Sequence, residues 1–435
     1  MPLTKLLKQP PPRLRLPGPV IALLLVAVAY VVLQVIFADR PVLGWDESIY
    51  VSQVSTGGKA MYFSAPRSRG ITLLVAPAAA LTSSVALLRL WMGLVSGVGL
   101  VVAFWPWLTL LRRYVVPLAA TLFISLWVVE FYGDQIMPNL YVAYGALTAA
   151  GWFVHAARSG NRRPLIALGA SVAFTALVRP ADAAFLVAAL GVAALIQSRF
   201  RVFAAMTVGA LAGVLPWIIE AYVRFGGVLS RMKASSYNEG TMGWHPAALW
   251  MELKALNGPT LCRPCTVGWR YPELSMWWLA LPFLVVLGLV VTARAERGPL
   301  LVAAACGAAA AFQYLFLIVY AAPRFLIPAY ALSALVVAAL IEQVVAKAPK
   351  TRRTAVIAAI GLLLAVQFGT QHVVLQRREA TPTGYPQSEN VRPSKGPMTV
   401  RVIGWSSTSA ATALMSSRVT ASIWASTSST ESSSS

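Results

Sequence analysis

The sequence predicts an all-α polytopic membrane protein with about 11 transmembrane helices. Of the 435 residues, 58% are hydrophobic and 12% are charged, whereas soluble domains carry about 25% charged residues. A single water-soluble core stops growing near about 250–300 residues, so this much apolar material needs lipid as its solvent. The apolar residues also form long unbroken runs, which excludes the short alternating segments of a transmembrane β-barrel.

Eleven apolar runs are candidates for membrane spans, since about 20 residues cross the hydrocarbon core. They lie near residues 20–37, 88–110, 115–131, 140–157, 164–178, 182–197, 202–219, 276–293, 299–320, 325–345 and 354–371. The first run is too long for the apolar region of a signal peptide, and no small-residue cleavage site follows, so we expect a signal anchor. The stretch 71–87 contains Pro77 and leads directly into another span, which favours a helix lying in the membrane interface.

The basic residues indicate the orientation of these spans. If the N-terminus is cytoplasmic, every inner connection is short and basic. These connections hold Arg112 and Arg113; Arg158, Arg162 and Arg163; Arg199 and Arg201; Arg294 and Arg297; and Lys347, Lys350, Arg352 and Arg353. The positive-inside rule therefore predicts an integral plasma membrane protein with its N-terminus inside and its C-terminus outside. The net charge of +21 is then a topology signal, and nucleic acid is not an expected partner.

This orientation divides the chain into a basic cytoplasmic N-terminus (1–19), a multi-spanning domain (20–371) and a tail rich in Ser and Thr (372–435). Two long connections, 38–87 and 220–275, lie outside. The tail has no apolar run to bury, so we expect it to be disordered. Its abrupt change in composition also fits an out-of-frame translated end.

Acidic residues and arginines collect in the outer connections. They are Asp46 and Glu47 in G-W-D-E-S-I-Y, Arg67 and Arg69 in S-A-P-R-S-R-G, Asp134 in D-Q-I-M-P-N, Arg179 in L-V-R-P and Arg324 in P-R-F-L-I-P. Carboxylates at a membrane face are costly unless solvated or paired, and arginines suit the oxygens of a phosphate. Asp46 could instead cap a short helix, and the arginines could simply pair with Asp46 and Glu47. The convergence of these residues at one membrane depth nevertheless indicates a site.

Together these motifs resemble the polyprenyl-phosphate-dependent glycosyltransferases of the GT-C fold, over roughly residues 15–345. The likeness is to the branch of protein O-mannosyltransferases and aminoarabinose lipid A transferases. It implies an inverting transfer at the extracytoplasmic face, from a polyprenyl-phosphate-linked sugar to a glycan, lipid or protein of the cell envelope. By position, Asp46 matches the family's catalytic acid and Asp134 its second acidic position.

The same resemblance places Arg67, Arg69 and Arg324 where cationic residues hold the donor phosphate. The sequence also departs from the family. Its outer loop after the seventh span is short, no large soluble domain follows the last span, and the metal ligands of some members have no evident match.

The residue types fit such a transfer. An acceptor hydroxyl must lose a proton as it attacks the anomeric carbon, so a nearby carboxylate can act as general base, and the departing lipid phosphate needs cations. We predict Asp46 as the base, with Glu47 and Asp134 as further catalytic carboxylates. The predicted phosphate clamp consists of Arg67, Arg69, Arg179 and Arg324. Asp46 and Asp134 could share a divalent metal ion or act without one.

The second outer connection adds candidates for substrate binding. With Tyr50 of the first connection, they are Arg224, Arg231, Trp244 and His245. Aromatic rings with cations suit sugars and phosphates, although Trp is also a common interfacial anchor. Cys262 and Cys265 are spaced for a local disulfide in an oxidising compartment, with a reactive redox pair as the alternative.

Two rival functions remain at this stage. A transporter or lipid flippase would need charges deep within the spans and often related halves, but the span interiors hold almost no ionisable residues. A non-catalytic assembly partner could keep the same fold with purely structural acids. An amide substitution at Asp46 separates it from the enzyme.

Overall fold

The computed structural model describes residues 17–37, 42–112, 114–257, 260–263, 265–266, 268–269 and 271–379. Most of the predicted cytoplasmic N-terminus, up to residue 16, lies outside the described residues, as does the predicted tail from residue 380 onward.

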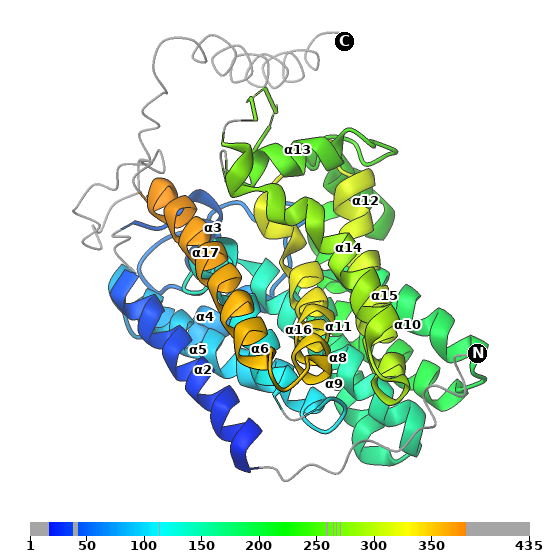
Figure 1. The fold of residues 1–435 in the computed structure, drawn as a ribbon. Helices are drawn as coiled ribbons and strands as arrows, with labels where there is room; N and C mark the ends of the chain where they lie inside the picture. Colours follow the sequence, from blue (N-terminus) through cyan, green and yellow to red (C-terminus); the bar gives the residue numbers. More distant parts are fainter. Residues whose placement is uncertain are drawn as a thin grey trace, which may run out of the picture. The chain divides into compact units, whose positions relative to one another are not determined.

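The described residues form helices and short 3-10 turns, which confirms the predicted all-α class (Figure 1). In chain order the elements are α2 (Pro17–Phe37), α3 (Trp45–Ser52), α4 (Gly70–Ala79), α5 (Val85–Phe104), η1 (Trp105–Trp107), α6 (Val115–Ile124), α7 (Trp127–Phe131), α8 (Pro138–Ser159), α9 (Arg162–Val178), α10 (Pro180–Ile196), α11 (Phe200–Phe225), α12 (Val228–Asn238), α13 (Ala248–Ala255), η2 (Pro272–Leu274), α14 (Met276–Val291), α15 (Arg294–Phe316), η3 (Pro323–Leu326), α16 (Ile327–Lys347) and α17 (Arg353–Glu379).

Seven of the described helical segments are long and apolar enough to cross a membrane. They are Gly18–Ile36, Val85–Trp107, Phe200–Phe225, Pro272–Val291, Arg294–Phe316, Pro323–Lys347 and Arg353–Arg377. The predicted count of eleven is not confirmed. One reason is the stretch 115–131, where α6 ends at Ile124 and α7 begins only at Trp127 after an extended Leu126. A continuous apolar run therefore yields two short helices instead of one span.

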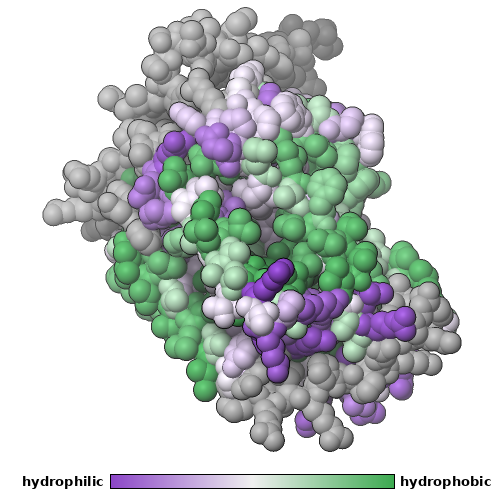
Figure 2. Space-filling model, viewed as in Figure 1, coloured by the Kyte–Doolittle hydropathy of each residue, from purple (hydrophilic) through white to green (hydrophobic). Residues whose placement is uncertain are grey.

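The apolar surface fits a lipid environment. Large hydrophobic side chains stay exposed on several helices, among them Leu25 of α2 (64%), Val98 of α5 (65%), Val208 of α11 (66%) and Phe283 of α14 (76%). Figure 2 shows hydrophobic residues across the middle of one face, with hydrophilic residues above and below them. Contiguous exposed apolar surface of this kind is expected of an integral membrane protein.

Helix α8 forms the centre of the packing, in contact with α5, α9, α15 and α16. It begins at Pro138, whose fixed φ suits a first helical position, and ends before Gly160, whose φ of +64° makes a left-handed cap. Small residues bring neighbouring helices together as well. A Cβ on Gly209 of α11 would meet the Gly169 carbonyl oxygen of α9 at 2.2 Å, so these backbones touch directly.

Three predicted boundaries need correction. The interfacial helix expected over 71–87 is the shorter α4, and α5 begins after a break at residues 80–84. The connection 220–275 is largely structured, because α11 continues to Phe225 and is followed by α12 and α13. Helix α17 runs beyond the predicted end at residue 371 as far as Glu379.

Candidate active site

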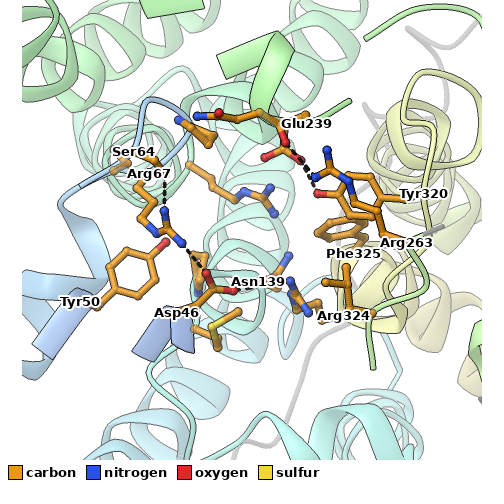
Figure 3. Close-up of a pocket in the computed structure, with 17 residues that line it drawn as sticks. Asp46, Tyr50, Ser64, Arg67, Asn139, Glu239, Arg263, Tyr320, Arg324 and Phe325 are labelled. Carbon is orange, nitrogen blue, oxygen red and sulfur yellow. Dashed lines mark hydrogen bonds and ion pairs between the residues drawn. The ribbon is translucent and has the colours of Figure 1, made fainter. Parts of the chain in front are cut away.

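Five connections between the longer helices meet around a cavity of about 220 Å³. Figure 3 shows Asp46, Tyr50 and Arg67 on one side and Glu239, Arg263 and Tyr320 on the other. Arg179, Arg324 and Asn139 also line it, so four of the predicted arginine and acid positions meet here: Asp46, Arg67, Arg179 and Arg324. The described lining carries four arginines and two carboxylates, which leaves an excess of two positive charges.

Asp46 lies between two of these arginines. An Nη atom of Arg67 is 2.5 Å from one carboxylate oxygen, and an Nη atom of Arg324 is 3.7 Å from the other. Arg67 also donates a hydrogen bond to the Ser64 hydroxyl. The Asp46 side chain remains 34% exposed, so a molecule in the cavity can reach its carboxylate.

Tyr50 belongs to the same wall, one helical turn after Asp46 on α3. Its ring meets Phe63 edge-on at 6.0 Å, and the Arg67 guanidinium lies 6.0 Å from its centroid. Burial, with a smaller contribution from the Asp46 charge, raises the pKa of Tyr50 to about 12. The phenol therefore stays protonated and can donate a hydrogen bond into the cavity.

Glu47 is absent from the described cavity lining, and its catalytic role stays a prediction. It is buried against α5, where both of its oxygens accept hydrogen bonds from Arg89. It also accepts the backbone N–H of Gly44 at 2.7 Å and that of Ile136 at 2.8 Å. Glu47, and not Asp46, thus caps the start of α3, and it joins that helix to α5 and to the turn before α8.

Asp134 lies in that same turn and is 1% exposed. Its backbone carbonyl accepts a hydrogen bond from Arg89 at 3.3 Å, and it is absent from the described cavity lining. Asp46 and Asp134 therefore do not form a common pair of ligands in the cavity. Within the described ranges, no group of three or more His, Cys, Asp or Glu side chains is placed to hold a metal ion, and we derive no step through one.

Arg69, Arg224 and Arg231 converge on Glu220 of α11 instead of on the cavity. We call these four residues the Glu220 cluster. The N–O distances to the Glu220 carboxylate are 2.5 Å from Arg69, 3.1 Å from Arg224 and 3.0 Å from Arg231. Their predicted role at the substrate stays a prediction, and in this structure all three form ion pairs with Glu220.

Arg231 connects this cluster to the cavity through the backbone. Its side chain is fully buried and donates to the carbonyls of Ala65 at 3.1 Å, Arg67 at 2.9 Å and Trp217 at 2.7 Å. Burial lowers the pKa of Arg231, against the opposing influence of Glu220. The guanidinium therefore holds in place the loop from which Arg67 reaches Asp46.

Trp244 and His245 lie away from the described cavity lining. The Trp244 ring stacks on Phe316 with centroids 5.3 Å apart, and the residue is 65% exposed. The backbone N–H of His245 donates to the Phe316 carbonyl at 2.6 Å. Both residues attach the connection between α12 and α13 to the end of α15.

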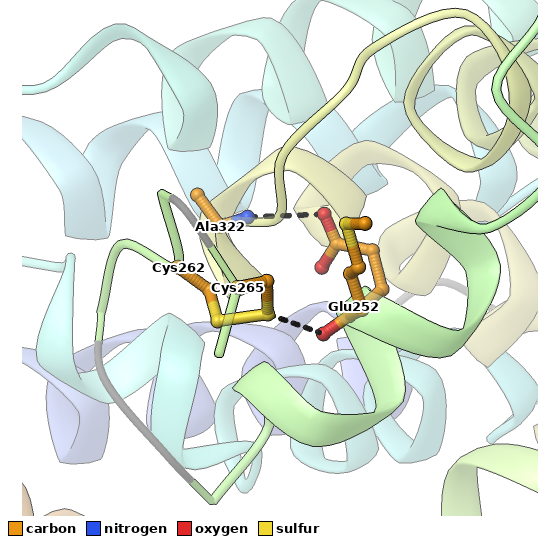
Figure 4. The surroundings of a disulfide bond; sticks show 5 residues. Glu252, Cys262, Cys265 and Ala322 are labelled. Atoms are coloured by element: carbon orange, nitrogen blue, oxygen red, sulfur yellow. Dashed lines mark hydrogen bonds between the residues drawn. A yellow bond between two sulfur atoms is a disulfide. The ribbon is translucent and has the colours of Figure 1, made fainter. Parts of the chain in front are cut away.

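Cys262 and Cys265 form a disulfide, shown in Figure 4. Cys262 pairs with Ala321 through two backbone hydrogen bonds of 2.9 and 3.3 Å. Behind it, the buried Glu252 accepts the Ala322 N–H at 3.1 Å, and burial raises the pKa of this carboxyl group well above its ordinary value. The disulfide segment brings Leu261 and Arg263 to the cavity.

Several functional candidates were missed by the sequence analysis: Ser64, Asn139, Glu239, Arg263 and Tyr320 line the cavity, and Arg89 holds Glu47. Ser64 and Asn139 lie within the motifs S-A-P-R-S-R-G and D-Q-I-M-P-N, and Arg263 lies between the paired cysteines, so position offered a signal for these three. Glu239 and Tyr320 have no such signal.

No protein-family model matches the chain, and no curated protein matches it in sequence. Solved structures do match. The crystal structure of ArnT from Cupriavidus metallidurans bound to undecaprenyl phosphate aligns with a TM-score of 0.56 and 12% identity, over 79% of this chain and 63% of that one. ArnT is a transferase of the GT-C fold. The present chain has the GT-C fold.

Two further GT-C structures align with lower scores. The apo state of the same ArnT gives a TM-score of 0.49 at 15% identity, over 79% of this chain and 63% of that one. The Archaeoglobus fulgidus oligosaccharyltransferase in its apo form gives 0.48 at 14% identity, over 88% of this chain and 62% of that one. The chain thus spans less than two thirds of the length of these GT-C proteins.

Proposed function

We propose that the chain is a membrane glycosyltransferase that moves a sugar from a polyprenyl-phosphate donor to an acceptor at the extracytoplasmic face, with inversion. The observation that carries this proposal is the cavity in which Asp46 lies between Arg67 and Arg324. It combines a carboxylate that an acceptor can reach with an excess of positive charge for a phosphate.

The donor side of the proposal follows from the arginines and from the lipid-facing surface. Guanidinium groups bind phosphate oxygens through paired hydrogen bonds, and Arg67, Arg179 and Arg324 all reach the cavity. A polyprenyl tail can remain in the hydrocarbon layer beside the exposed apolar helices while its headgroup enters the cavity. The bound undecaprenyl phosphate in the ArnT structure, which shares this fold, supports a lipid phosphate of that kind.

The proposed reaction is a single displacement. The acceptor oxygen attacks the anomeric carbon from the face opposite the phosphate, and the carbon–oxygen bond to the lipid phosphate breaks. Asp46 takes the acceptor proton, and Arg67 and Arg324, released from Asp46, stabilise the charge on the departing phosphate. Attack from the opposite face inverts the configuration at the anomeric carbon.

The orientation is supported by the distribution of charge along individual helices. The cavity is lined from the starts of α8, α10 and α16, at Asn139, Arg179 and Arg324. The opposite ends of these helices carry the basic connections predicted to be cytoplasmic, around Arg158, Arg199 and Lys347. The positive-inside rule then favours an outer position for the cavity. Cysteine labelling with an impermeant reagent at Gly240 but not at Ser159 would agree with this placement, and labelling at Ser159 in intact cells would overturn it.

The function is tested by complementing a deletion strain and comparing lipids, wall polymers and secreted proteins by mass spectrometry. Wild type and the exposed control Glu273→Gln should both restore one missing glycoform, whereas Asp46→Asn at equal membrane abundance should not. Full restoration by Asp46→Asn would favour the assembly partner. A strain with normal glycoforms but altered lipid distribution would favour the flippase.

A further inference from the structure

Asn139 is a buried polar side chain whose amide faces the cavity (Figure 3). It follows Pro138 at the start of α8 and is only 2% exposed. Among the residues that the structure describes, no hydrogen bond joins its amide to another group. An amide offers two donors and an acceptor, and where this one lines the cavity they are available to a ligand. Such a group is therefore suited to a polar ligand in the cavity.

Glu239, across the cavity, is a carboxylate that is only partly used. One of its oxygens accepts the hydroxyl of Tyr320. Among the described residues, the other oxygen has no hydrogen-bonding partner and no arginine or lysine within ion-pair distance. This differs from Asp46, which is held by two guanidinium groups.

Tyr320 fixes Glu239 on a rigid wall. Burial, and after it the charge of Glu239, raises the pKa of Tyr320, so the phenol stays protonated and keeps donating its hydrogen bond. The Tyr320 ring meets Phe325 edge-on at 5.5 Å, and the Arg263 guanidinium lies 4.9 Å from its centroid. Arg263 in turn donates to the Asn238 carbonyl at 2.8 Å. Glu239 is thus presented in a set position beside an aromatic surface.

We propose that Asn139 and Glu239 form a subsite for the hydroxyl groups of a sugar. A carboxylate repels a phosphate but accepts hydrogen bonds from hydroxyls, and an amide can both donate to them and accept from them. The arginines of the cavity provide for the phosphate, so these two residues add a different recognition chemistry. The inference rests on the proposed transferase function. The sugar can be the one carried by the donor or one in the acceptor.

The donor arm of the test compares two lipid probes bound to the purified protein in nanodiscs. The probes are undecaprenyl phosphate and a set of undecaprenyl-phosphate-linked hexoses. Asn139→Ala should leave the affinity for undecaprenyl phosphate within about twofold, and Glu239→Gln should not weaken it, because removing a carboxylate lessens the repulsion of the phosphate. If the subsite holds the donor sugar, each variant should weaken the sugar-linked lipid about 10-fold or more, as expected for a hydrogen bond that involves a charged group or a buried amide.

The acceptor arm uses the transfer assay with the acceptor class identified from the missing glycoform. If the subsite holds an acceptor sugar, donor affinity is not weakened and the acceptor KM rises about 10-fold or more in both variants. Glu273→Gln, an exposed carboxylate outside the cavity lining, serves as the matched control and should change neither quantity. Glu239→Gln keeps the side-chain shape, so it covers the case in which Asn139→Ala folds poorly.

Two results would overturn the subsite. One is an equal loss of affinity for the lipid with and without its sugar, which would mean a general disturbance of the cavity. The other is an affinity for the sugar-linked lipid that is not weakened, together with an unchanged acceptor KM. In that second case the proposed function still stands if Arg324→Ala loses undecaprenyl phosphate, and it fails separately if Arg324→Ala binds the lipid phosphate like wild type.

Discussion

The structure contains two carboxylates that are each surrounded by arginines: Asp46 at the cavity and Glu220 in the Glu220 cluster. The segment 64–69 contributes an arginine to both, but the hydrogen-bond donors of the two groups of arginines have different partners. At the cavity, Arg67 and Arg324 meet an Asp46 side chain that is 34% exposed. In the Glu220 cluster, Arg231 is fully buried and its donors are taken by Glu220 and three backbone carbonyls. An arginine whose N–H groups all donate to backbone carbonyls has few donors left for a ligand. An arginine that pairs with an exposed carboxylate at a cavity can exchange that carboxylate for a phosphate.

The largest effect should come from Asp46→Asn at the cavity. Asn keeps the side-chain shape but cannot take a proton, and loss of a general base lowers rates about 10²- to 10⁴-fold. We expect that loss in the transfer rate with an unchanged thermal unfolding midpoint. A wild-type rate in the purified variant would remove Asp46 from the mechanism.

Arg231→Met tests the structural side of the comparison. Removing one partner of a buried ion pair costs about 3–5 kcal/mol, and here three carbonyls also lose a donor. We expect a large fall in the unfolding midpoint, with weaker undecaprenyl phosphate binding because the loop of Arg67 loosens. Arg224→Gln is the matched control, since this half-exposed i,i+4 pair is worth only about 0.3–0.5 kcal/mol. Equal midpoints for the two variants would contradict the assignment.

Glu47→Gln sharpens the contrast with its neighbour. Glu47 forms a buried ion pair with Arg89, so its neutralisation should cost stability of the same order, about 3–5 kcal/mol. The rate per folded molecule should change little at temperatures where the variant is folded. A severe loss of rate with normal stability would instead return Glu47 to the catalytic group.

The phenol of Tyr50 in the cavity wall should make the stability of the fold depend on alkaline pH. Its pKa is about 12 in the folded chain against 10.0 ordinarily, so the folded state keeps the proton after the unfolded state has lost it. This contribution to stability is present below pH 10 and disappears as the pH rises towards 12. It amounts to at most about 2–3 kcal/mol. Tyr50→Phe should therefore show a smaller fall in unfolding midpoint than wild type between pH 10 and 12, and identical curves would exclude this linkage.

The smallest effect should come from the disulfide. A four-residue loop closed by Cys262 and Cys265 gives about 2 kcal/mol in the chain-entropy account. The double variant Cys262→Ser, Cys265→Ser should lower the midpoint modestly and weaken binding through Arg263 and the Thr260 contact to Arg324. Mass-shift counting in the native protein should find neither outer cysteine alkylated. Alkylation of both would favour the redox pair.

The membrane class could be predicted from the sequence more readily than the geometry of the site. Asp46, Arg67, Arg179 and Arg324 were identified because each lies just outside an apolar run. Asp46 and Glu47 could not be separated in this way, since adjacent residues of a helix point about 100° apart and the packing of α3 decides which one faces the cavity. Glu239 and Tyr320 come together only through the fold, from segments without a recognisable motif. Hydropathy also gives the length of an apolar run but does not show whether the helix within it is continuous. For this reason 115–131 was predicted as one span.

The break between α6 and α7 makes the packing of these two helices depend on α17, more than 200 residues later in the sequence. Buried backbone groups have no water to bind, so an interrupted helix needs protein partners for its amides. The backbone N–H of Trp127, at the restart, donates to the Gln371 side chain of α17 at 3.1 Å. Only 6% of the apolar window of α17 is buried, yet this helix supplies an acceptor that lipid cannot replace. A chain shortened before α17 therefore loses a partner for the interior of the bundle as well as its last apolar helix.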